Sequence, residues 1–267
     1  MVFSFEEYLK KKNLSQNTIK SYLFAVNQYQ SKYLILNKKN LQAYKTFLVE
    51  NYKIKTVNLR IQAINSYLKY SKKDNLRLPL LKLQQKNFLE NVISEADYEY
   101  FKKCLKNEKE MYWYFVIRFI TATGARISEL IQFKVEHVKI GYFDLYSKGG
   151  KLRRIYIPQK LQEEALKWFE EKEITDGFLF KNKFGKRITA RGIAGELKKL
   201  GKKYGLNPNV IYPHSFRHRF AKSFLDRFND ISLLADLMGH ESIETTRIYL
   251  RRTSTEQQEI VNKIIDW

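Results

Sequence analysis

The stretch YFDLYSKGGKLRRIYIP, residues 142–158, decides the fold class, because it interrupts a chain that is otherwise patterned for helices. Residues 142–147 and 153–158 form two short alternating runs, a pattern typical of β-strands. The residues between them, KGGK at 148–151, supply a Gly-Gly turn of the kind that joins two strands into a β-hairpin. We therefore expect a mostly helical α+β fold with one small hairpin.

Helical periodicity dominates on both sides of this hairpin. Ser15 is placed to cap a helix whose apolar side chains recur at three- and four-residue spacing as far as Tyr29, and similar patterns predict a helical bundle over 1–76. Pro79 then interrupts the periodicity, which indicates an extended connector over 77–93. A second domain, 94–267, begins where Ser94 caps a new helix. Its expected helices cover roughly 94–106, 110–122, 126–132, 159–172, 189–204, 213–228, 231–238 and 242–250.

The chain is strongly basic, with 49 Lys and Arg residues against 28 Asp and Glu among its 267 residues, a net charge of +21. Residues 1–90 hold 17 basic and 5 acidic side chains, so more than half of the surplus lies there. Such a surplus favours approach to a polyanion, and nucleic acid is the partner that it indicates best. Anionic membranes and ribosomes are alternatives, and so is a lysine-rich composition without functional meaning.

Three features of the sequence indicate the cytoplasm. Cys104 is the single cysteine, so an internal disulfide cannot form, which fits a reducing compartment. The first residues, 1–12, are charged and have no long apolar core, so they do not resemble a signal peptide. The longest apolar run, 111–117, is far shorter than the roughly 20 residues that cross a bilayer.

Residues 123–130 read TGARISEL and contain a candidate phosphate-binding group. Gly124 suits a tight turn into a helix, Arg126 would lie at the start of that helix, and Glu129 follows within reach of the guanidinium. An Arg held by a carboxylate presents a fixed fork of donors suited to a phosphate. Alone, however, this pattern is more typical of a structural Arg–Glu pair.

Further segments carry groups with phosphate chemistry. His214 and Arg217 are three residues apart, so on a helix they project from one face and can reach one phosphate, and His moves protons near neutral pH. His240 follows a glycine at a predicted helix end, and Tyr249 lies nine residues later. Each signal is weak alone, since His-x-x-Arg is common by chance and the chain has 18 tyrosines. His218 is expected to serve packing or to face solvent.

Together, these residues fit metal-free cleavage of a phosphodiester by a tyrosine. Attack by Tyr249 would create a five-coordinate transition state, whose extra negative charge the arginines and a histidine stabilise. A lysine of the hairpin turn, Lys148 or its rival Lys151, would protonate the departing 5′ hydroxyl. The phosphotyrosine keeps the energy of the broken bond, so a second hydroxyl can reseal the strand without ATP. The sequence shows no metal-ligand spacing and no phosphate-binding glycine loop, so no metal or cofactor is expected.

This ordered set resembles the active site of the tyrosine recombinase (phage integrase) family, and within it the short Xer-type recombinases. The resemblance covers essentially the whole chain. Met238 replaces the usual Leu before Gly-His, and the hairpin is longer than in the family pattern, which keeps Lys151 as an alternative proton donor. The resemblance implies catalytic roles for Arg126, Lys148, His214, Arg217, His240 and Tyr249, with Glu129 in support.

The resemblance also implies an architecture and partners. The N-terminal bundle is similar to the family's core-binding domain, which forms a C-shaped clamp around double-stranded DNA together with the catalytic domain. We expect an inverted-repeat recognition site, a dimer on one site, a cyclic tetramer in synapsis and an accessory translocase as an optional partner. The amphipathic tail, 256–267, with Ile260, Ile264, Ile265 and Trp267, would dock on the neighbouring subunit or else pack on its own domain. Candidate DNA contacts are Lys20, Lys55, Arg60, Lys69 and Arg191.

The leading hypothesis is therefore site-specific recombination through a 3′-phosphotyrosine. Its biological task would be chromosome or plasmid dimer resolution, or integration and excision of a mobile element. One alternative is a DNA-relaxing enzyme of the type IB topoisomerase kind that uses the same residues and needs no paired sites. The other is a DNA-binding regulator that forms no covalent adduct.

Overall fold

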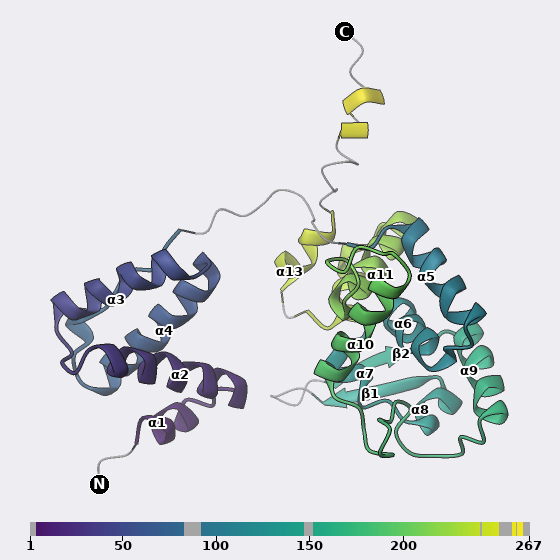
Figure 1. Ribbon diagram of the computed structural model, residues 1–267, viewed down its shortest axis with the longest axis horizontal. Coiled ribbons are helices and arrows are strands. Elements are labelled where there is room, and N and C mark those ends of the chain that lie inside the picture. Colours follow the sequence, from purple (N-terminus) through teal and green to yellow (C-terminus); the bar gives the residue numbers. More distant parts are fainter. Residues whose placement is uncertain are drawn as a thin grey trace. The chain divides into compact units, whose positions relative to one another are not determined.

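The chain divides into two compact units, Met1–Gln85 and Lys86–Trp267, which Figure 1 colours from purple to blue and from teal to yellow. The division falls inside the connector predicted over 77–93. Within the described residues, helices dominate and two strands form one antiparallel sheet, which confirms the predicted fold class. The structure is a computed structural model, and it describes residues 4–82, 92–146, 152–240, 242–250, 258–259 and 261–263.

The first unit is a helical bundle. Ser15 caps a helix as predicted, since its hydroxyl accepts a hydrogen bond from the amide of Thr18 at 3.2 Å. The core contains buried aliphatic side chains, the ring of Phe5 and the rings of Tyr29 and Tyr44, which meet edge-on with their centroids 5.2 Å apart. The helices are α1 (Phe5–Lys11), α2 (Gln16–Lys32), α3 (Lys38–Asn51), α4 (Ile54–Tyr70) and the 3-10 helix η1 (Asp74–Leu76).

Two asparagines of α4 bind the first part of the predicted connector to this bundle. Asn65 accepts a hydrogen bond from the amide of Leu78 at 2.8 Å and donates one to its carbonyl at 2.9 Å. Asn58 makes the same pair of bonds with Leu81, at 2.8 and 2.9 Å. Because the asparagines are seven residues apart, they lie on one face of the helix. The extended segment around Leu78 and Leu81 is therefore bound to α4 through its main chain. Residues 83–91 lie outside the described part of the chain.

The second unit contains the hairpin and the remaining helices. Strands β1 (Tyr142–Tyr146) and β2 (Leu152–Tyr156) pair antiparallel, with Tyr142 opposite Tyr156, which confirms the predicted hairpin. Helix α8 was not predicted, because its six residues are too few for helical periodicity to show. The helices are α5 (Glu95–Asn107), α6 (Met111–Thr123), α7 (Ile127–Leu130), α8 (Val135–Ile140), α9 (Gln159–Glu171), α10 (Ala190–Lys203), α11 (Pro213–Arg227), α12 (Ile231–Met238), α13 (Ile243–Arg247) and the 3-10 helix η2 (Ile248–Leu250).

Helix α6 forms the centre of this unit and leads directly into the predicted site. It is apolar on nearly all faces and packs against α5, α9 and α11. The helix ends at Gly124, whose φ of 63° lies in the left-handed region, and a Cβ there would collide with the ring of Phe220. Glycine is thus required at the turn that places Arg126. In the described parts of the chain, no helix is both long and apolar enough to cross a membrane.

Candidate active site

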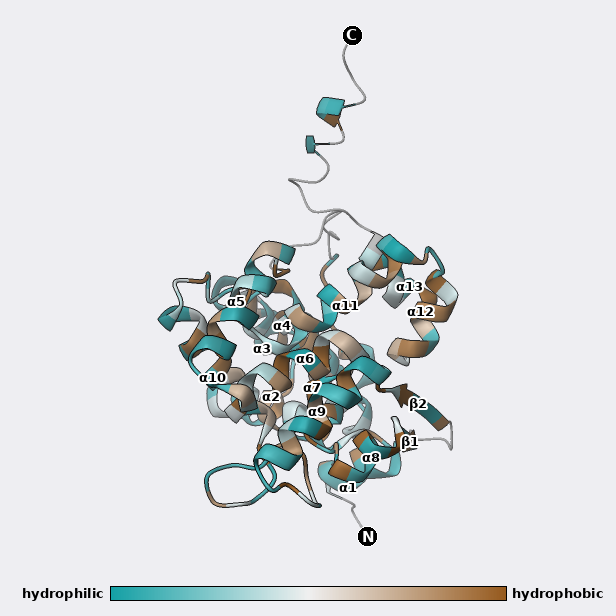
Figure 2. Ribbon diagram, turned by 90° about the vertical axis from the view of Figure 1, so that its right-hand side faces the viewer, coloured by the Kyte–Doolittle hydropathy of each residue, from teal (hydrophilic) through white to brown (hydrophobic). Residues whose placement is uncertain are grey.

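Three arginines bind the carboxyl end of α12. This helix is largely apolar (Figure 2), and Gly239 ends it with a left-handed φ of 61°. The last carbonyls of a helix have no partner within it and carry the negative end of its dipole. Here three successive carbonyls each accept a hydrogen bond from a different arginine, so positive charge from three separate segments fixes the turn before His240. The pairs are Leu237 with Arg153 (Nη2, 2.7 Å), Met238 with Arg217 (Nη2, 2.8 Å) and Gly239 with Arg126 (Nη2, 2.8 Å).

One buried carboxylate, that of Glu129, lies against the same three arginines. Its Oε1 accepts hydrogen bonds from Nη1 of Arg126 at 2.9 Å and from Nη1 of Arg153 at 2.7 Å. Its Oε2 accepts one from the backbone amide of Arg126 at 2.6 Å and lies 3.9 Å from Nη1 of Arg217. The predicted contact between Arg126 and Glu129 is confirmed. The carboxylate also offsets the cost of bringing three guanidinium groups together.

The two predicted phosphate-binding arginines differ in their access to solvent. Arg217 on α11 is 1% exposed, and its Nη1 donates to the carbonyl of Gly124. Burial lowers the pKa of Arg217 to about 10, which leaves it charged at neutral pH. The side chain of Arg126 is 37% exposed and lines a pocket of about 550 Å³ together with His214 and Arg217. Arg126 and His214 are therefore placed to touch a ligand, whereas Arg217 is almost entirely enclosed by protein.

Burial and nearby charge keep the histidines of the site neutral. Nε2 of His240 lies 3.1 Å from Nη2 of Arg217, and Nδ1 lies 2.7 Å from the hydroxyl of Thr246. Because a guanidinium only donates, Nε2 accepts, and Nδ1 carries the proton and donates to Thr246. Burial lowers the pKa of His240 to about 4, with Arg217 and Arg126 adding to the effect. Desolvation and the same two charges lower the pKa of His214, so both rings are uncharged near neutral pH.

Tyr249 lies in η2, and its buried ring contacts two imidazoles. Its centroid lies 6.1 Å from that of His240, with the rings nearly parallel, and 5.2 Å from that of His218. Burial raises the pKa of Tyr249, while Arg217, which interacts with its hydroxyl, lowers it. The phenol is protonated at neutral pH and needs a base to become a nucleophile.

The structure thus brings most of the predicted site residues into one cluster. The cluster contains Arg126, Glu129, His214, Arg217, His240 and Tyr249. The catalytic roles assigned to them stay predictions. Lys148 and Lys151, the alternative proton donors, lie outside the described residues.

Two residues in contact with the cluster, His218 and Arg153, were missed as functional candidates. His218 was expected to pack or to face solvent, and it packs, but against the ring of Tyr249. Its four-residue distance from His214 could have placed it on the same helix face, although nothing local shows that the tyrosine lies there. Arg153 carries no local signal, because its contacts with Glu129 and Leu237 join segments that are distant in sequence.

The five predicted DNA contacts lie on α2, α4 and α10, and their roles also stay predictions. Arg60 is partly buried, with Nη1 donating to Gln28 at 2.7 Å and the guanidinium 3.8 Å from the ring centroid of Tyr52. The other side chains are exposed: Lys20, Lys55, Lys69 and Arg191.

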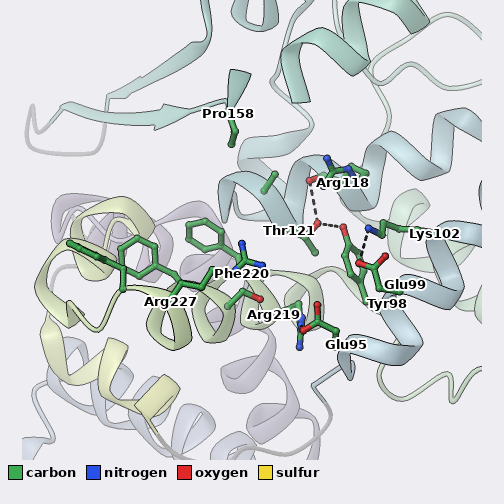
Figure 3. Close-up of a pocket in the computed structure, with 14 residues that line it drawn as sticks. Glu95, Tyr98, Glu99, Lys102, Arg118, Thr121, Pro158, Arg219, Phe220 and Arg227 are labelled. Atoms are coloured by element: carbon green, nitrogen blue, oxygen red, sulfur yellow. Dashed lines mark hydrogen bonds and ion pairs between the residues drawn. The ribbon is translucent and has the colours of Figure 1, made fainter. Parts of the chain in front are cut away.

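A second hollow in this unit lies between α5, α6 and α11 (Figure 3). It has a volume of about 400 Å³ and contains none of the predicted catalytic residues. Phe220 and Phe224 of α11 and Ala122 of α6 supply apolar surface. Basic side chains outnumber acidic ones around it: Lys102, Arg118, Arg219 and Arg227 against Glu95 and Glu99.

Comparison with known proteins decides the family. The model of the phage integrase family matches residues 89–256, which include every predicted catalytic residue. The chain belongs to this family. As a member, this recombinase is a site-specific enzyme that cuts and rejoins DNA, and its chemistry requires neither metal nor ATP. Among the described residues, no group of His, Cys, Asp and Glu side chains could hold a metal ion.

Relatives that match the recombinase over nearly its full length include Xer proteins. It is 28% identical to the tyrosine recombinase XerA of Pyrococcus furiosus, with 97% of this chain and 92% of the relative covered. It is 26% identical to XerC of Leptospira interrogans, with 97% and 91% covered. The crystal structure of a XerA recombinase is similar at 25% identity and a TM-score of 0.55, covering 97% and 95% of the two chains. The Tn1549 transposon integrase in complex with circular intermediate DNA shares the fold at a TM-score of 0.74 and 17% identity, covering 96% of each chain.

Proposed function

We propose that the recombinase cleaves each strand by attack of Tyr249 on a phosphodiester. The tyrosine oxygen bonds to phosphorus as its proton passes to a neutral histidine of the site, the bond to the 5′ oxygen breaks, and a 3′-phosphotyrosine and a 5′ hydroxyl result. Lys148, with Lys151 as the alternative, supplies the proton to the departing oxygen. The observation that carries this proposal is the buried ring of Tyr249 beside His240, in reach of Arg217. A second 5′ hydroxyl then attacks the phosphotyrosine and reseals the strand.

The arginines supply electrostatic stabilisation in this scheme. Arg126 and His214 line the pocket and would bind the non-bridging oxygens, while Arg217 adds charge from its buried position. Their hydrogen bonds to the α12 carbonyls and to Glu129 hold them in place before DNA arrives. Donors that are fixed in advance need no reorganisation as charge develops, which is the most effective form of such catalysis.

Helix α10 is proposed to bind DNA next to this pocket. Arg191, Lys198 and Lys202 are exposed at spacings that place them along one side of the helix. Lys198 lines the same pocket as Arg126 and His214, so a duplex whose phosphate enters the pocket would pass over it. The predicted contacts Lys20, Lys55, Lys69 and Arg60 of the first unit would bind the backbone as that unit closes around DNA with the second.

Adjacent lysines on α10 allow a matched test of this surface. Lys198→Ala is expected to weaken DNA binding several-fold and to lower the slope of log affinity against log salt by about 1, because one phosphate contact is lost. Lys199→Ala removes the same charge one residue away, where Nζ already binds Glu196 at 2.9 Å, and is expected to change neither quantity. The measurement is a fluorescence-anisotropy titration of labelled duplex at several salt concentrations. Equal effects of the two variants would contradict the proposed surface.

Assembly on DNA is proposed to follow the family pattern of a dimer on an inverted-repeat site and a cyclic tetramer in synapsis. Solved relatives include the XerH recombinase bound to its difH substrate and a dimer of lambda integrase bound to a core site. The tail, 256–267, is the proposed link between neighbours, and the second hollow is its proposed acceptor (Figure 3). The tail contributes apolar side chains and more acidic than basic residues, which complements the apolar surface and basic surroundings of the hollow. An accessory translocase stays an expectation.

The test uses a duplex selected by the protein from a random-sequence pool. A nick beside the cleavage point lets the short 5′ fragment diffuse away, so the wild-type protein should accumulate an adduct that survives SDS. On a supercoiled plasmid, recombination should require two copies of the selected site. A chain that ends at Thr255 should still form the adduct on one site and lose recombination between two.

Each other outcome identifies a different function. Specific binding without an adduct would mean a DNA-binding regulator. Relaxation of a plasmid that lacks sites, without recombination when two are present, would mean a topoisomerase-like enzyme. Full recombination by the shortened chain would contradict the role of the tail. Whether the task is dimer resolution or movement of an element would follow from where the selected site occurs in the genome.

A further inference from the structure

Arg153 links the hairpin to the active site without lining it. It lies on β2, its side chain is 12% exposed, and it is absent from the lining of the pocket as the described residues define it. Nη1 donates to Oε1 of Glu129 at 2.7 Å, and Nη2 and Nε donate to the carbonyl of Leu237 at 2.7 and 3.1 Å. The guanidinium therefore joins three segments: β2, α7 and the carboxyl end of α12.

These bonds act on two groups of the active site: Arg126, which lines the pocket, and His240, which contacts the ring of Tyr249. Oε1 of Glu129 is shared between Arg153 and Arg126, so Arg153 sets the position from which the carboxylate holds Arg126. At α12, Arg153 holds the carbonyl of Leu237 two residues before the glycine that precedes His240. A Cβ on Gly239 would collide with Cδ and Nε of Arg153, so the turn itself is packed against this side chain.

We propose that Arg153 is a positioning residue for the strand-cleavage reaction, acting through Glu129 on Arg126 and through Leu237 on the turn that carries His240. This inference rests on the proposed function. Burying a guanidinium away from solvent is costly, and apolar side chains of similar size commonly replace such groups without loss of stability. The hydrogen bonds of Arg153 to Glu129 and to Leu237 are therefore expected to orient the reacting groups. Loss of these bonds should lower the rate of cleavage more than the affinity for DNA.

The next residue offers a matched control. Arg154 projects from the opposite face of β2, because side chains alternate along a strand. Its guanidinium binds both carboxylate oxygens of Asp144, at 2.7 and 2.8 Å, and lies 3.8 Å from the ring centroid of Tyr142. Arg154→Gln thus removes the same charge from the same strand and leaves the α12 turn untouched.

A double-mutant cycle distinguishes positioning from general stabilisation. Arg153→Gln alone is expected to slow single-turnover adduct formation about 10²-fold, comparable with loss of one preorganised donor. Arg126→Lys alone should also slow it. The double variant should be little slower than the slower single variant, because both changes disable the same group. Arg154→Gln should leave the cleavage rate at the wild-type value, and adding it to Arg126→Lys should leave the rate of that variant unchanged. The DNA affinity of Arg153→Gln and of Arg154→Gln should stay within about two-fold of wild type.

The outcomes separate the failure of this inference from failure of the proposed function. The positioning role would be overturned if the double variant slowed adduct formation by a factor equal to or greater than the product of the two single factors, or formed no detectable adduct. It would also be overturned if Arg153→Gln cleaved at the same rate as Arg154→Gln. If Arg153→Gln does not fold, Arg153→Lys enters the same cycle, since a lysine can reach only one of the two acceptors. Wild-type protein that forms no adduct on the selected duplex would instead overturn the proposed function.

Discussion

Tyr249→Phe is expected to abolish the covalent protein–DNA adduct, lowering its rate of formation by at least about 10⁴-fold, because it removes the attacking oxygen. The ring remains, so its packing against His218 and His240 should persist. Loss of a single hydroxyl should change the free energy of unfolding by no more than about 1 kcal/mol. The adduct is measured on SDS gels with the nicked duplex, and DNA binding is measured separately by anisotropy, where the variant should match wild type.

A second tyrosine of the same site is the control for this substitution. Tyr212 precedes α11 and lines the pocket that contains Arg126 and His214, and burial raises its pKa. Tyr212→Phe should keep the adduct, because its hydroxyl has no role in the proposed scheme. An adduct that survives in Tyr249→Phe, or that disappears in Tyr212→Phe alone, would show that the nucleophile has been assigned to the wrong residue.

Local patterns in the sequence were sufficient to predict most of the helices, the hairpin and the order of the site residues. Ser15 and Ser94 each accept a hydrogen bond from the amide three residues later, as their positions predict. The contact of Arg126 with Glu129 was also predictable, since three residues on a helix bring two side chains together. Such predictions succeed because the interacting groups are close in sequence, so backbone geometry alone determines their distance.

The rest depends on contacts between distant segments. Arg153 and Leu237 are far apart in the chain, and their bond exists only because β2 packs against the end of α12. The ring contact of His218 with Tyr249 likewise requires η2 to pack on α11. The two asparagines of α4 that bind the connector appear in the sequence as ordinary polar residues of a helix. In each case, the partner of a side chain is set by the tertiary fold, about which a local pattern carries no information.

Arg217→Ala is expected to damage both stability and catalysis. The side chain is 1% exposed, and its removal leaves the carbonyls of Gly124 and Met238 without these donors and takes one of three guanidinium groups away from Glu129. Breaking a buried charged network of this kind costs about 3–5 kcal/mol in the free energy of unfolding. The chain's tryptophans, Trp113, Trp168 and Trp267, all belong to the second unit, so urea unfolding followed by their fluorescence reports on the affected unit.

The catalytic part of this prediction is tested where the variant is still folded. At low temperature and without urea, cleavage by Arg217→Ala should be about 10²- to 10³-fold slower than wild type, the usual loss for one preorganised donor at a developing charge. Arg217→Lys keeps a charge but can serve only one carbonyl, so it should recover part of the rate and little of the stability. If Arg217 were only structural, the folded alanine variant would cleave at the wild-type rate. If it were only a phosphate ligand, the alanine variant would unfold at the wild-type urea concentration, which its hydrogen bonds to two main-chain carbonyls argue against.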